Sequence, residues 1–173
     1  MPAAASNATP LIYLAKIGKL DLLKELFGEI LIPKEVWNEV VEKGKRLGRK
    51  DAYAVEKAIV EGWIKVVAAD PFEMPIELDK GEEEALSLAK QLKLETVLVD
   101  EVSARSAARL LGLTPRGTIF VLLMALKERK IELDEFLQAL DQLIDEGFRL
   151  KEEVYVQAVR EATKLTKKGR TYL

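Results

Sequence analysis

The sequence contains no cysteine and no histidine, and these two absences remove several classes of chemistry. Without cysteine there can be no disulfide, no thiolate metal ligand and no cysteine nucleophile. Without histidine there can be no serine–histidine catalysis, no histidine proton shuttle and no histidine-bound zinc. Any catalysis must therefore depend on carboxylates, lysine, arginine, hydroxyl groups or a hard metal ion bound by oxygen atoms.

Long hydrophobic runs and an excess of charge of one sign are also missing. The longest apolar run, residues 119–126, is far shorter than the roughly 20 residues that a membrane span requires. The N-terminal MPAAASNATP has no basic region followed by an apolar stretch, so we expect no signal peptide and a cytoplasmic location. The formal net charge of −2 excludes attraction of the whole protein to nucleic acid, and such contacts would need local basic patches.

The composition that remains is that of a folded protein. Of the 173 residues, 49% are hydrophobic and 32% are charged, which suits a single domain with a sizeable core. The richness in lysine and glutamate is typical of thermophilic proteins. Short apolar segments indicate strands at 3–6, 29–33, 63–68 and 96–100. Helical patterns are predicted at 10–17, 19–27, 34–43, 51–62, 82–92, 101–111, 117–129, 133–146 and 151–165.

The order of these elements predicts the fold class. Strands that alternate with helices indicate an α/β protein with a central parallel sheet and helices on both faces, and such a sheet binds ligands beyond the carboxyl ends of its strands. Thr9 is predicted to cap the first helix, with Pro10 at its first position. Residues 44–50 are predicted to form a basic loop, residues 70–81 the longest irregular stretch, and the basic tail 166–173 is expected to fray.

Two carboxylates occupy positions that are not typical of ordinary solvent-exposed acids. Asp100 ends the apolar segment TVLVD, so its carboxylate should emerge at the carboxyl edge of the sheet. The alternative is that Asp100 only caps the following helix. Glu82 falls within the apolar arc of its helix, whereas Glu83 and Glu84 are expected to point elsewhere. A core-facing carboxylate needs a positive partner such as the helix dipole or a metal ion, unless it reaches solvent from a frayed first turn.

Glu39 and Asn7 are weaker candidates from spacing alone. Of the three acids in its helix, Glu39 lies closest to the apolar arc of Val36, Trp37 and Val40, but an ordinary solvated glutamate is an equal alternative. Asn7 would follow the first strand, where it is either a helix cap or a ligand. Its amide oxygen can bind a hard cation but supplies no negative charge.

Six segments together resemble one known family. They are SNATPLIYLAKIGKLDLL (6–23), IPKEVWNEVV (32–41), DKGEEEALSLA (79–89), VLVDEVSARSAARLLGL (97–113), GT (117–118) and LIDEGFRLKEEVY (143–155). In this order and spacing, which covers most of the chain, they resemble the PIN domain, a fold of small metal-dependent ribonucleases. The likeness is greatest to short archaeal and bacterial PIN proteins related to the toxins of toxin–antitoxin pairs. The resemblance implies a three-layer PIN-like fold with a central parallel sheet.

The resemblance also implies a metal site at the carboxyl edge of the sheet. One or two Mg²⁺ or Mn²⁺ ions would be bound there by Asn7, Glu39, Glu82 and Asp100, of which the three acids would be catalytic. Asn7 stands where the family usually has an aspartate, so one negative charge is missing from the implied set. Thr9 matches the hydroxyl residue that supports the first ligand.

The chemistry fits these residues without the family name. Cleavage of a phosphodiester needs an activated water and a stabilised leaving oxygen, and a divalent metal held by carboxylates supplies both. Without metal, three crowded acids would repel one another and raise a pKa, so the alternative is an empty site with one carboxyl protonated.

Basic residues indicate where RNA could lie. The predicted RNA-binding residues are Lys45, Arg46, Arg49 and Arg109, and Arg105 is a supporting residue one helical turn after Asp100. The alternatives are ordinary solvated charges and, for Arg105, an ion pair with one of the acids.

These observations favour a metal-dependent endoribonuclease, with residues 1–130 as a PIN-like catalytic domain and 131–173 as a helical extension packed on it. It could be the toxin of a toxin–antitoxin pair, with RNA as substrate and a small antitoxin as partner, and we expect a homodimer. A second hypothesis is a catalytically silent PIN module that binds RNA or protein, because Asn7 replaces the usual aspartate. A third, a small-molecule binding module, is disfavoured because no glycine-rich phosphate loop follows the first strand.

Overall fold

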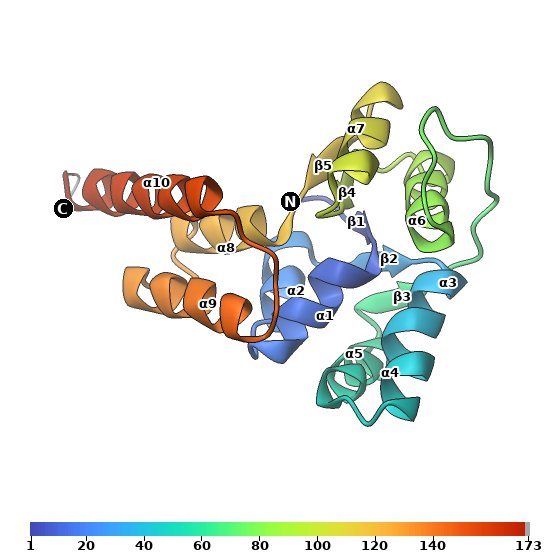
Figure 1. The fold of residues 1–173 in the computed structure, drawn as a ribbon, viewed down its shortest axis with the longest axis horizontal. Helices are drawn as coiled ribbons and strands as arrows, with labels where there is room; N and C mark the ends of the chain where they lie inside the picture. Colours follow the sequence, from blue (N-terminus) through green and yellow to red (C-terminus); the bar gives the residue numbers. More distant parts are fainter. Residues whose placement is uncertain (172–173) are drawn as a thin grey trace. The chain divides into compact units, whose positions relative to one another are not determined.

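The computed structural model describes the backbone of residues 1–171 and the side chains through residue 167 (Figure 1). The chain divides into two compact units, Met1–Thr118 and Ile119–Leu173, and each is described here by itself. The division falls at the start of a helix, earlier in the chain than the predicted boundary at residue 130. The predicted packing of residues 131–173 on the catalytic domain stays a prediction.

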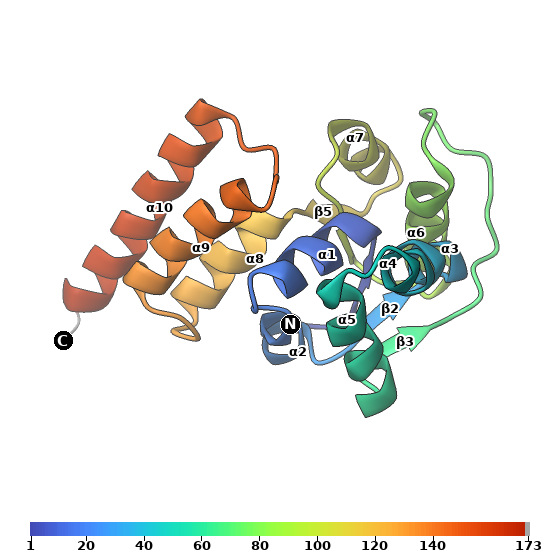
Figure 2. The same ribbon diagram turned by 60° about the horizontal axis from the view of Figure 1, so that its bottom comes forward.

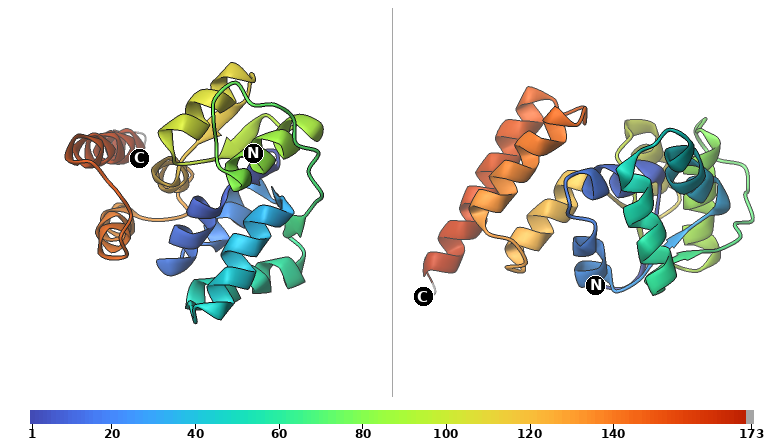
Figure 3. Two further views of the ribbon diagram at one scale, coloured as in Figure 1. Left: turned by 45° about the vertical axis from the view of Figure 1, so that its right-hand side comes forward. Right: turned by 90° about the horizontal axis from the view of Figure 1, so that it is seen from below.

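The first unit is built on a five-stranded parallel sheet with the strand order β3-β2-β1-β4-β5, whose strands are labelled in Figure 1. Figure 2 shows β2 and β3 side by side. The strands are β1 (Ala4–Ser6), β2 (Ile30–Ile32), β3 (Ile64–Val66), β4 (Thr96–Leu98) and β5 (Thr114–Arg116). Helices lie around this sheet, which confirms the predicted three-layer α/β fold (Figure 3).

The strand order places a switch point in the middle of the sheet. The chain leaves β1 toward β2 on one side, whereas β4 lies on the other side of β1 and pairs with it from Ala4 to Ser6. In open α/β sheets the crevice outside the carboxyl ends of the strands at such a point is the usual ligand site. Asn7 follows β1 and Asp100 follows β4, so both lie at this place.

Helices connect the parallel strands along the chain. Between β1 and β3 they are α1 (Ala8–Lys16), α2 (Asp21–Phe27), α3 (Lys34–Trp37), a π-helical turn (Asn38–Glu42), α4 (Lys43–Arg46) and α5 (Lys50–Glu61). After β3 they are α6 (Lys80–Gln91) and α7 (Val102–Leu110). On the face covered by α6 and α7, one hydrophobic cluster joins Ala5 and Val97 of the sheet to Ala85 and Ala104 of the helices.

Three helix boundaries near the sheet edge differ from the prediction. α1 begins at Ala8, so Asn7 and not Thr9 is its cap residue, and Pro10 lies inside the first turn. Proline is tolerated there because the first N–H groups of a helix have no intrahelical partner. Much of the predicted basic loop 44–50 is helical, within α4 and at the start of α5. α6 begins at Lys80, before the predicted residue 82.

The strand β5 is missing from the sequence-based prediction. Its three residues include Pro115, which has no N–H to donate and is a poor strand former. β5 is at the edge of the sheet, where only one side needs ladder hydrogen bonds and a proline is acceptable. A short edge strand with proline carries too little local pattern to be recognised.

The second unit contains α8 from residue 119 onward (Thr118–Lys127), α9 (Leu133–Asp145) and α10 (Glu152–Thr171). Tyr155 Oη donates to Asp141 Oδ1 at 3.0 Å and so links α10 to α9. No helix in the described part of the chain is long and apolar enough to cross a membrane. The basic tail was expected to fray from residue 166, but its backbone is helical as far as Thr171, and residues 172–173 lie outside the described residues.

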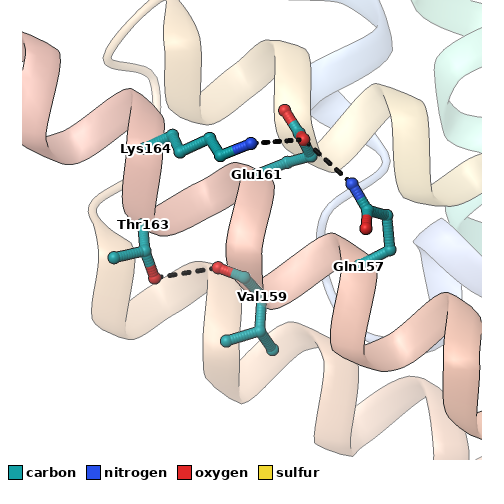
Figure 4. Close-up of polar contacts among 5 residues, drawn as sticks. All are labelled: Gln157, Val159, Glu161, Thr163 and Lys164. Atoms are coloured by element: carbon teal, nitrogen blue, oxygen red, sulfur yellow. Dashed lines mark hydrogen bonds and ion pairs between the residues drawn. The ribbon is translucent and has the colours of Figure 1, made fainter.

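Side-chain contacts along α10 follow helical spacing (Figure 4). Gln157 Nε2 donates to Glu161 Oε1 at 2.9 Å, and Lys164 Nζ lies 3.5 Å from the same oxygen. Thr163 Oγ1 donates to the carbonyl of Val159 at 2.8 Å. The two side-chain pairs, at i, i+4 and i, i+3, each stabilise a helix by roughly 0.2–0.5 kcal/mol, whereas a threonine bond to the i−4 carbonyl adds no such stability.

Candidate metal centre

Asn7 is held at the switch point by its backbone, and its side chain is left available. Its N–H donates to the carbonyl of Leu98 at 2.9 Å, and Ser6 Oγ donates to the Asn7 carbonyl at 2.9 Å. The residue is 5% exposed, yet its side chain makes no capping hydrogen bond. Asn7 therefore takes the cap position of α1 without acting as a side-chain cap.

Three side-chain oxygens lie near one point beside Gly81. The point is where a Cβ atom on Gly81 would lie, with Asn7 Oδ1 3.4 Å away and both Asp79 Oδ1 and Glu39 Oε2 3.6 Å away. These atoms come from the end of β1, the N-terminus of α6 and the π-helical turn after β2. A residue with a side chain would fill this space, so glycine keeps it open.

Asp79 and Glu82 form a reciprocal cap at the start of α6. The N–H of Glu82 donates to Asp79 Oδ1 at 2.8 Å, and the N–H of Asp79 donates to Glu82 Oε1 at 3.2 Å. Glu82 is 6% exposed, in agreement with its place on the apolar arc. Glu84 is also buried, contrary to the expectation that it points away, because α6 is covered on more than one side.

Glu39 lies in a π-helical turn, where the sequence predicts a regular helix. Such turns are frequent at functional sites because they re-aim the side chains of a helix. Although the residue as a whole is exposed, its Oε2 faces the point beside Gly81. Arg49 Nη2 reaches the carbonyl of Glu39 at 3.4 Å, and Arg49 Nε lies 3.7 Å from Asp51 Oδ2. Arg49 thus supports the turn that carries Glu39.

Asp100 is fixed by the segment that follows β5. Thr118 donates to both of its oxygens, from N–H to Oδ1 at 2.8 Å and from Oγ1 to Oδ2 at 2.7 Å. A Cβ on Gly117 would lie 2.7 Å from Asp100 Oδ1 and 3.3 Å from Arg105 Nη1, so only glycine fits. The guanidinium of Arg105 therefore lies beside the carboxylate, although the two form no ion pair and Arg105 donates no hydrogen bond within the described residues.

The electrostatics of Asp100 reflect these neighbours. Burial raises the pKa of Asp100 above its ordinary value, and the charge of Glu101 raises it further. The two hydrogen bonds from Thr118 and the charge of Arg105 lower the pKa in part. Burial has the largest effect on the pKa of Asp100, so the hydrogen bonds from Thr118 and the charge of Arg105 only partly offset the cost of ionising the buried carboxylate.

Glu39 and Glu82 are affected in the same direction. Partial desolvation of their carboxylates raises the pKa of each, and the negative charge of Asp79 raises both further. For Glu82, the backbone hydrogen bond from Asp79 opposes the increase, whereas the charge of Glu101 adds to it. Like charges are thus crowded along one edge of the sheet, an arrangement that a bound cation would relieve.

The remaining predicted residues lie around this edge or on exposed surfaces. Thr9 is half-buried in the first turn of α1, while Arg46 and Arg109 are exposed. Lys45 Nζ is 2.8 Å from Glu56 Oε2 and lies over the ring of Tyr53. RNA contacts by the basic residues stay predictions.

Sequence reasoning missed four residues at the edge: Asp79, Glu101, Gly117 and Thr118. A local signal existed for Asp79, because an aspartate followed three residues later by a glutamate is the pattern of a capping box. For Gly117 and Thr118, only the family resemblance marked the dipeptide, and their contact with Asp100 depends on the pairing of β4 with β5.

The donor set suits a hard cation, since it consists of carboxylate and amide oxygens. Within the described residues, no group of three acidic side chains is placed close enough to hold a metal ion, so the predicted set of Glu39, Glu82 and Asp100 stays a prediction. Around the point beside Gly81 there are two carboxylates and the amide of Asn7. That point is one bond length from Gly81 Cα, so a cation bound by these oxygens would lie to one side of it, and Mg²⁺ in proteins usually keeps several of its waters. The oxygens present therefore fit a hydrated divalent ion.

The comparisons with known proteins agree with this geometry. A family model, DUF3368, described as a PIN domain, matches residues 3–164. No curated protein matches the chain significantly. The family match spans the parallel sheet, the acidic edge and the helices as far as α10. PIN domains are generally nucleases that use divalent metal ions, so the chain carries a nuclease-like module. With its five parallel strands and this match over nearly its whole length, the chain belongs to the PIN-domain family.

Proposed function

We propose that the protein is a metal-dependent endoribonuclease that hydrolyses phosphodiester bonds in RNA with Mg²⁺ or Mn²⁺. The observation that carries this proposal is the meeting of Asn7, Glu39 and Asp79 oxygens around one open point, next to the switch point of the sheet. Glu82 and Asp100 belong to the same edge through their electrostatic contacts with Asp79 and Glu101. Catalysis by histidine or cysteine is excluded, because the chain contains neither residue.

The residues that would hold the cation are Asn7, Glu39, Glu82 and Asp100. A divalent cation bound there would supply a water of lowered pKa and neutralise charge on the scissile phosphate. Glu82 is oriented by the cap at the start of α6. Asp100 is kept in one orientation by its two hydrogen bonds from Thr118. Fixed orientation of each carboxylate in this way favours catalysis.

Arg105 would bind the phosphate. Its guanidinium lies beside Asp100 and donates no hydrogen bond within the described residues, so its donors can take a phosphate oxygen. The exposed Arg46 and Arg109, together with Lys45, would contact the RNA backbone on either side. Arg49 would contribute less directly, since its guanidinium faces Glu39 and Asp51.

We further propose that this nuclease is the toxin of a toxin–antitoxin pair, that a small antitoxin protein binds it and that it forms a homodimer. The support is the resemblance to short PIN toxins, and α9 and α10 carry exposed apolar side chains, Ile144, Val154 and Val156, that a protein could cover. Co-expression with the neighbouring reading frame tests the pairing. Growth arrest by the protein alone, relieved by the neighbour, is the expected result.

A second candidate is a catalytically silent PIN module that binds RNA or protein. Asn7 favours it, because a neutral amide replaces a charged ligand at the buried centre of the site. In this case the acidic edge would bind metal weakly or not at all.

RNA cleavage with a chelator control separates the two candidates. Mixed-sequence RNA is incubated with the full chain in Mn²⁺, in Mg²⁺ and in chelator, with Asp100→Asn as the inactive variant. We expect cleavage that requires metal and that falls at least about 100-fold in the variant. RNA binding without cleavage in either metal would favour the silent module, and cleavage that persists in Asp100→Asn would show a contaminating nuclease.

A further inference from the structure

The first position of the acidic site lacks a charge that the family usually places there. Asn7 is 5% exposed, and within the described residues its side chain takes part in no hydrogen bond. A largely buried amide that has no partner within the protein is available to a ligand that reaches it. Its Oδ1 is directed at the open point beside Gly81. An amide oxygen there can bind a cation but cannot neutralise it.

A carboxylate that sequence reasoning did not single out reaches the same point. Asp79 Oδ1 lies 3.6 Å from it, at the same distance as Glu39 Oε2. Oδ1 also accepts the N–H of Glu82 at 2.8 Å, whereas Oδ2 accepts no hydrogen bond within the described residues. Asp79 therefore has an oxygen to offer while it caps α6.

The position of Asp79 is set by the segment before it. Residues 67–79 form the long connection between β3 and α6, drawn in Figure 1 as a loop beside α6. Its apolar residues Met74, Ile76 and Leu78 pack on the hydrophobic cluster under α6 and α7. Anchored on one side by Leu78 and on the other by the cap of α6, the side chain of Asp79 has little freedom to leave the site.

Capping alone does not require a carboxylate at this position. Asparagine and serine are about as good as aspartate at a helix N-cap. A charge at position 79 also lies close to Glu39 and Glu82, which are themselves acidic. In the absence of a cation, this repulsion is a cost that an asparagine would avoid.

We propose that Asp79 is a further cation-binding residue, which supplies to the site the negative charge that Asn7 lacks. This inference rests on the proposed metal-dependent function and extends its ligand set by one residue. The chain would thus hold the cation with the same number of charges as a PIN site that has aspartate at its first position, but with one charge moved from β1 to α6.

The experiment measures Mn²⁺ binding to the metal-free full chain by the loss of the electron paramagnetic resonance signal of free Mn²⁺, with no RNA present. The variants are Asp79→Asn, which keeps a capping side chain, and Asp70→Asn as a matched control. Asp70 lies in the same connection, but its N–H bonds to Gln91 at the opposite end of α6. A third variant, Asn7→Asp combined with Asp79→Asn, moves the charge back to β1.

We expect Asp79→Asn to weaken Mn²⁺ binding at least about tenfold, and Asp70→Asn to leave it unchanged. The combined variant should bind Mn²⁺ with about the wild-type affinity, because a charge at position 7 would attract the same ion as the charge removed from position 79. The effects of the two substitutions on affinity are therefore coupled. Unfolding in urea with chelator checks that each variant folds.

Two results would overturn the inference. If Asp79→Asn binds Mn²⁺ as tightly as the wild type, Asp79 is a helix cap only. If Asn7→Asp does not rescue Asp79→Asn, the two positions do not share one charge requirement. Failure of the proposed function looks different, since then the wild type would bind no Mn²⁺ that Asp100→Asn removes.

Discussion

Thr118 donates two hydrogen bonds to the two carboxylate oxygens of Asp100, one from its backbone N–H at 2.8 Å and one from its hydroxyl at 2.7 Å. The pair joins the second residue after β4 to the first residue of α8, and Thr118 is fully buried. A carboxylate that accepts two hydrogen bonds from one residue can neither rotate nor translate easily. Thr118 is therefore the residue that orients Asp100.

The first prediction removes one of these bonds. Thr118→Val keeps the shape of the side chain but deletes the hydroxyl, so Asp100 Oδ2 loses its donor. We expect a loss of unfolding free energy of about 1–3 kcal/mol in urea, whereas Thr118→Ser should lose less than about 1 kcal/mol. Equal stability of the valine variant and the wild type would show that water replaces the hydroxyl without cost.

The second prediction compares two glycines of the site. A Cβ at Gly117 would meet Asp100 Oδ1 at 2.7 Å, so Gly117→Ala must displace the carboxylate and should destabilise the protein by about 1–3 kcal/mol. A Cβ at Gly81 would meet its neighbours at 3.4–3.6 Å, which is ordinary contact.

Gly81→Ala should therefore fold well and gain up to about 1 kcal/mol, because alanine favours a helix more than glycine does. Its methyl group would nevertheless fill the point between Asn7, Asp79 and Glu39, so Mn²⁺ binding should weaken. Urea unfolding in chelator measures the stability, and titration with Mn²⁺ measures the affinity. A variant that is more stable and binds Mn²⁺ normally would place the cation elsewhere.

The third prediction concerns pH in the absence of metal. The pKa of Glu39, Glu82 and Asp100 is raised in the folded state, chiefly by burial. Between the ordinary carboxyl range of about 4 and these raised values, the folded state binds more protons than the unfolded state. The contribution of these groups to the unfolding free energy should therefore be greatest at pH values below the ordinary carboxyl pKa. It should fall as the pH rises through the folded-state pKa values.

Urea unfolding in chelator at a series of pH values tests this dependence. Asp100→Asn removes one of the three groups, so the fall should become smaller. With saturating Mn²⁺ the direction should reverse, because metal binding requires deprotonated carboxylates. A metal-free protein whose stability rises over the same interval would contradict the crowding of acids at the sheet edge.

How much of this site follows from sequence depends on how local each signal is. Asp100 follows an apolar strand and Glu82 falls on the buried arc of a helix, so hydrophobic periodicity and the order of strands and helices are enough to single them out as candidates. Asp79 was assigned to a loop because Pro71 and Pro75 precede it, although its spacing to Glu82 is that of a capping box. The contact of an N-cap side chain with other ligands is tertiary and has no local signature.

The same argument applies to residues whose role depends on the backbone. The predicted RNA contact of Arg49 stays a prediction, but sequence gives no sign that its guanidinium reaches the carbonyl of Glu39 across a π-helical turn. No simple periodicity predicts such a turn, since it adds one residue to a regular helix. The strand β1 has a weak local signal for a different reason, because alanine is a poor strand former and the burial of β1 at the centre of the sheet stabilises it.

The last prediction concerns Asn7, the neutral member of the site. Asn7→Asp is nearly isosteric, and the residue caps α1 in position without a side-chain bond, so the fold should be retained. The substitution adds a negative charge at a buried point that faces Glu39 and Asp79. In chelator the repulsion should lower the unfolding free energy by about 1–3 kcal/mol, since a buried charge without a partner is costly.

With Mn²⁺ the effect should change sign, because the same charge attracts the cation in a cleft where screening is incomplete. The variant should bind Mn²⁺ at least about tenfold more tightly and gain more thermal stability from it than the wild type does. RNA cleavage at low Mn²⁺ should rise in parallel. Stability lost without metal and regained with it would place position 7 among the ligands, whereas unchanged stability and unchanged affinity would leave Asn7 as the cap residue of α1 only.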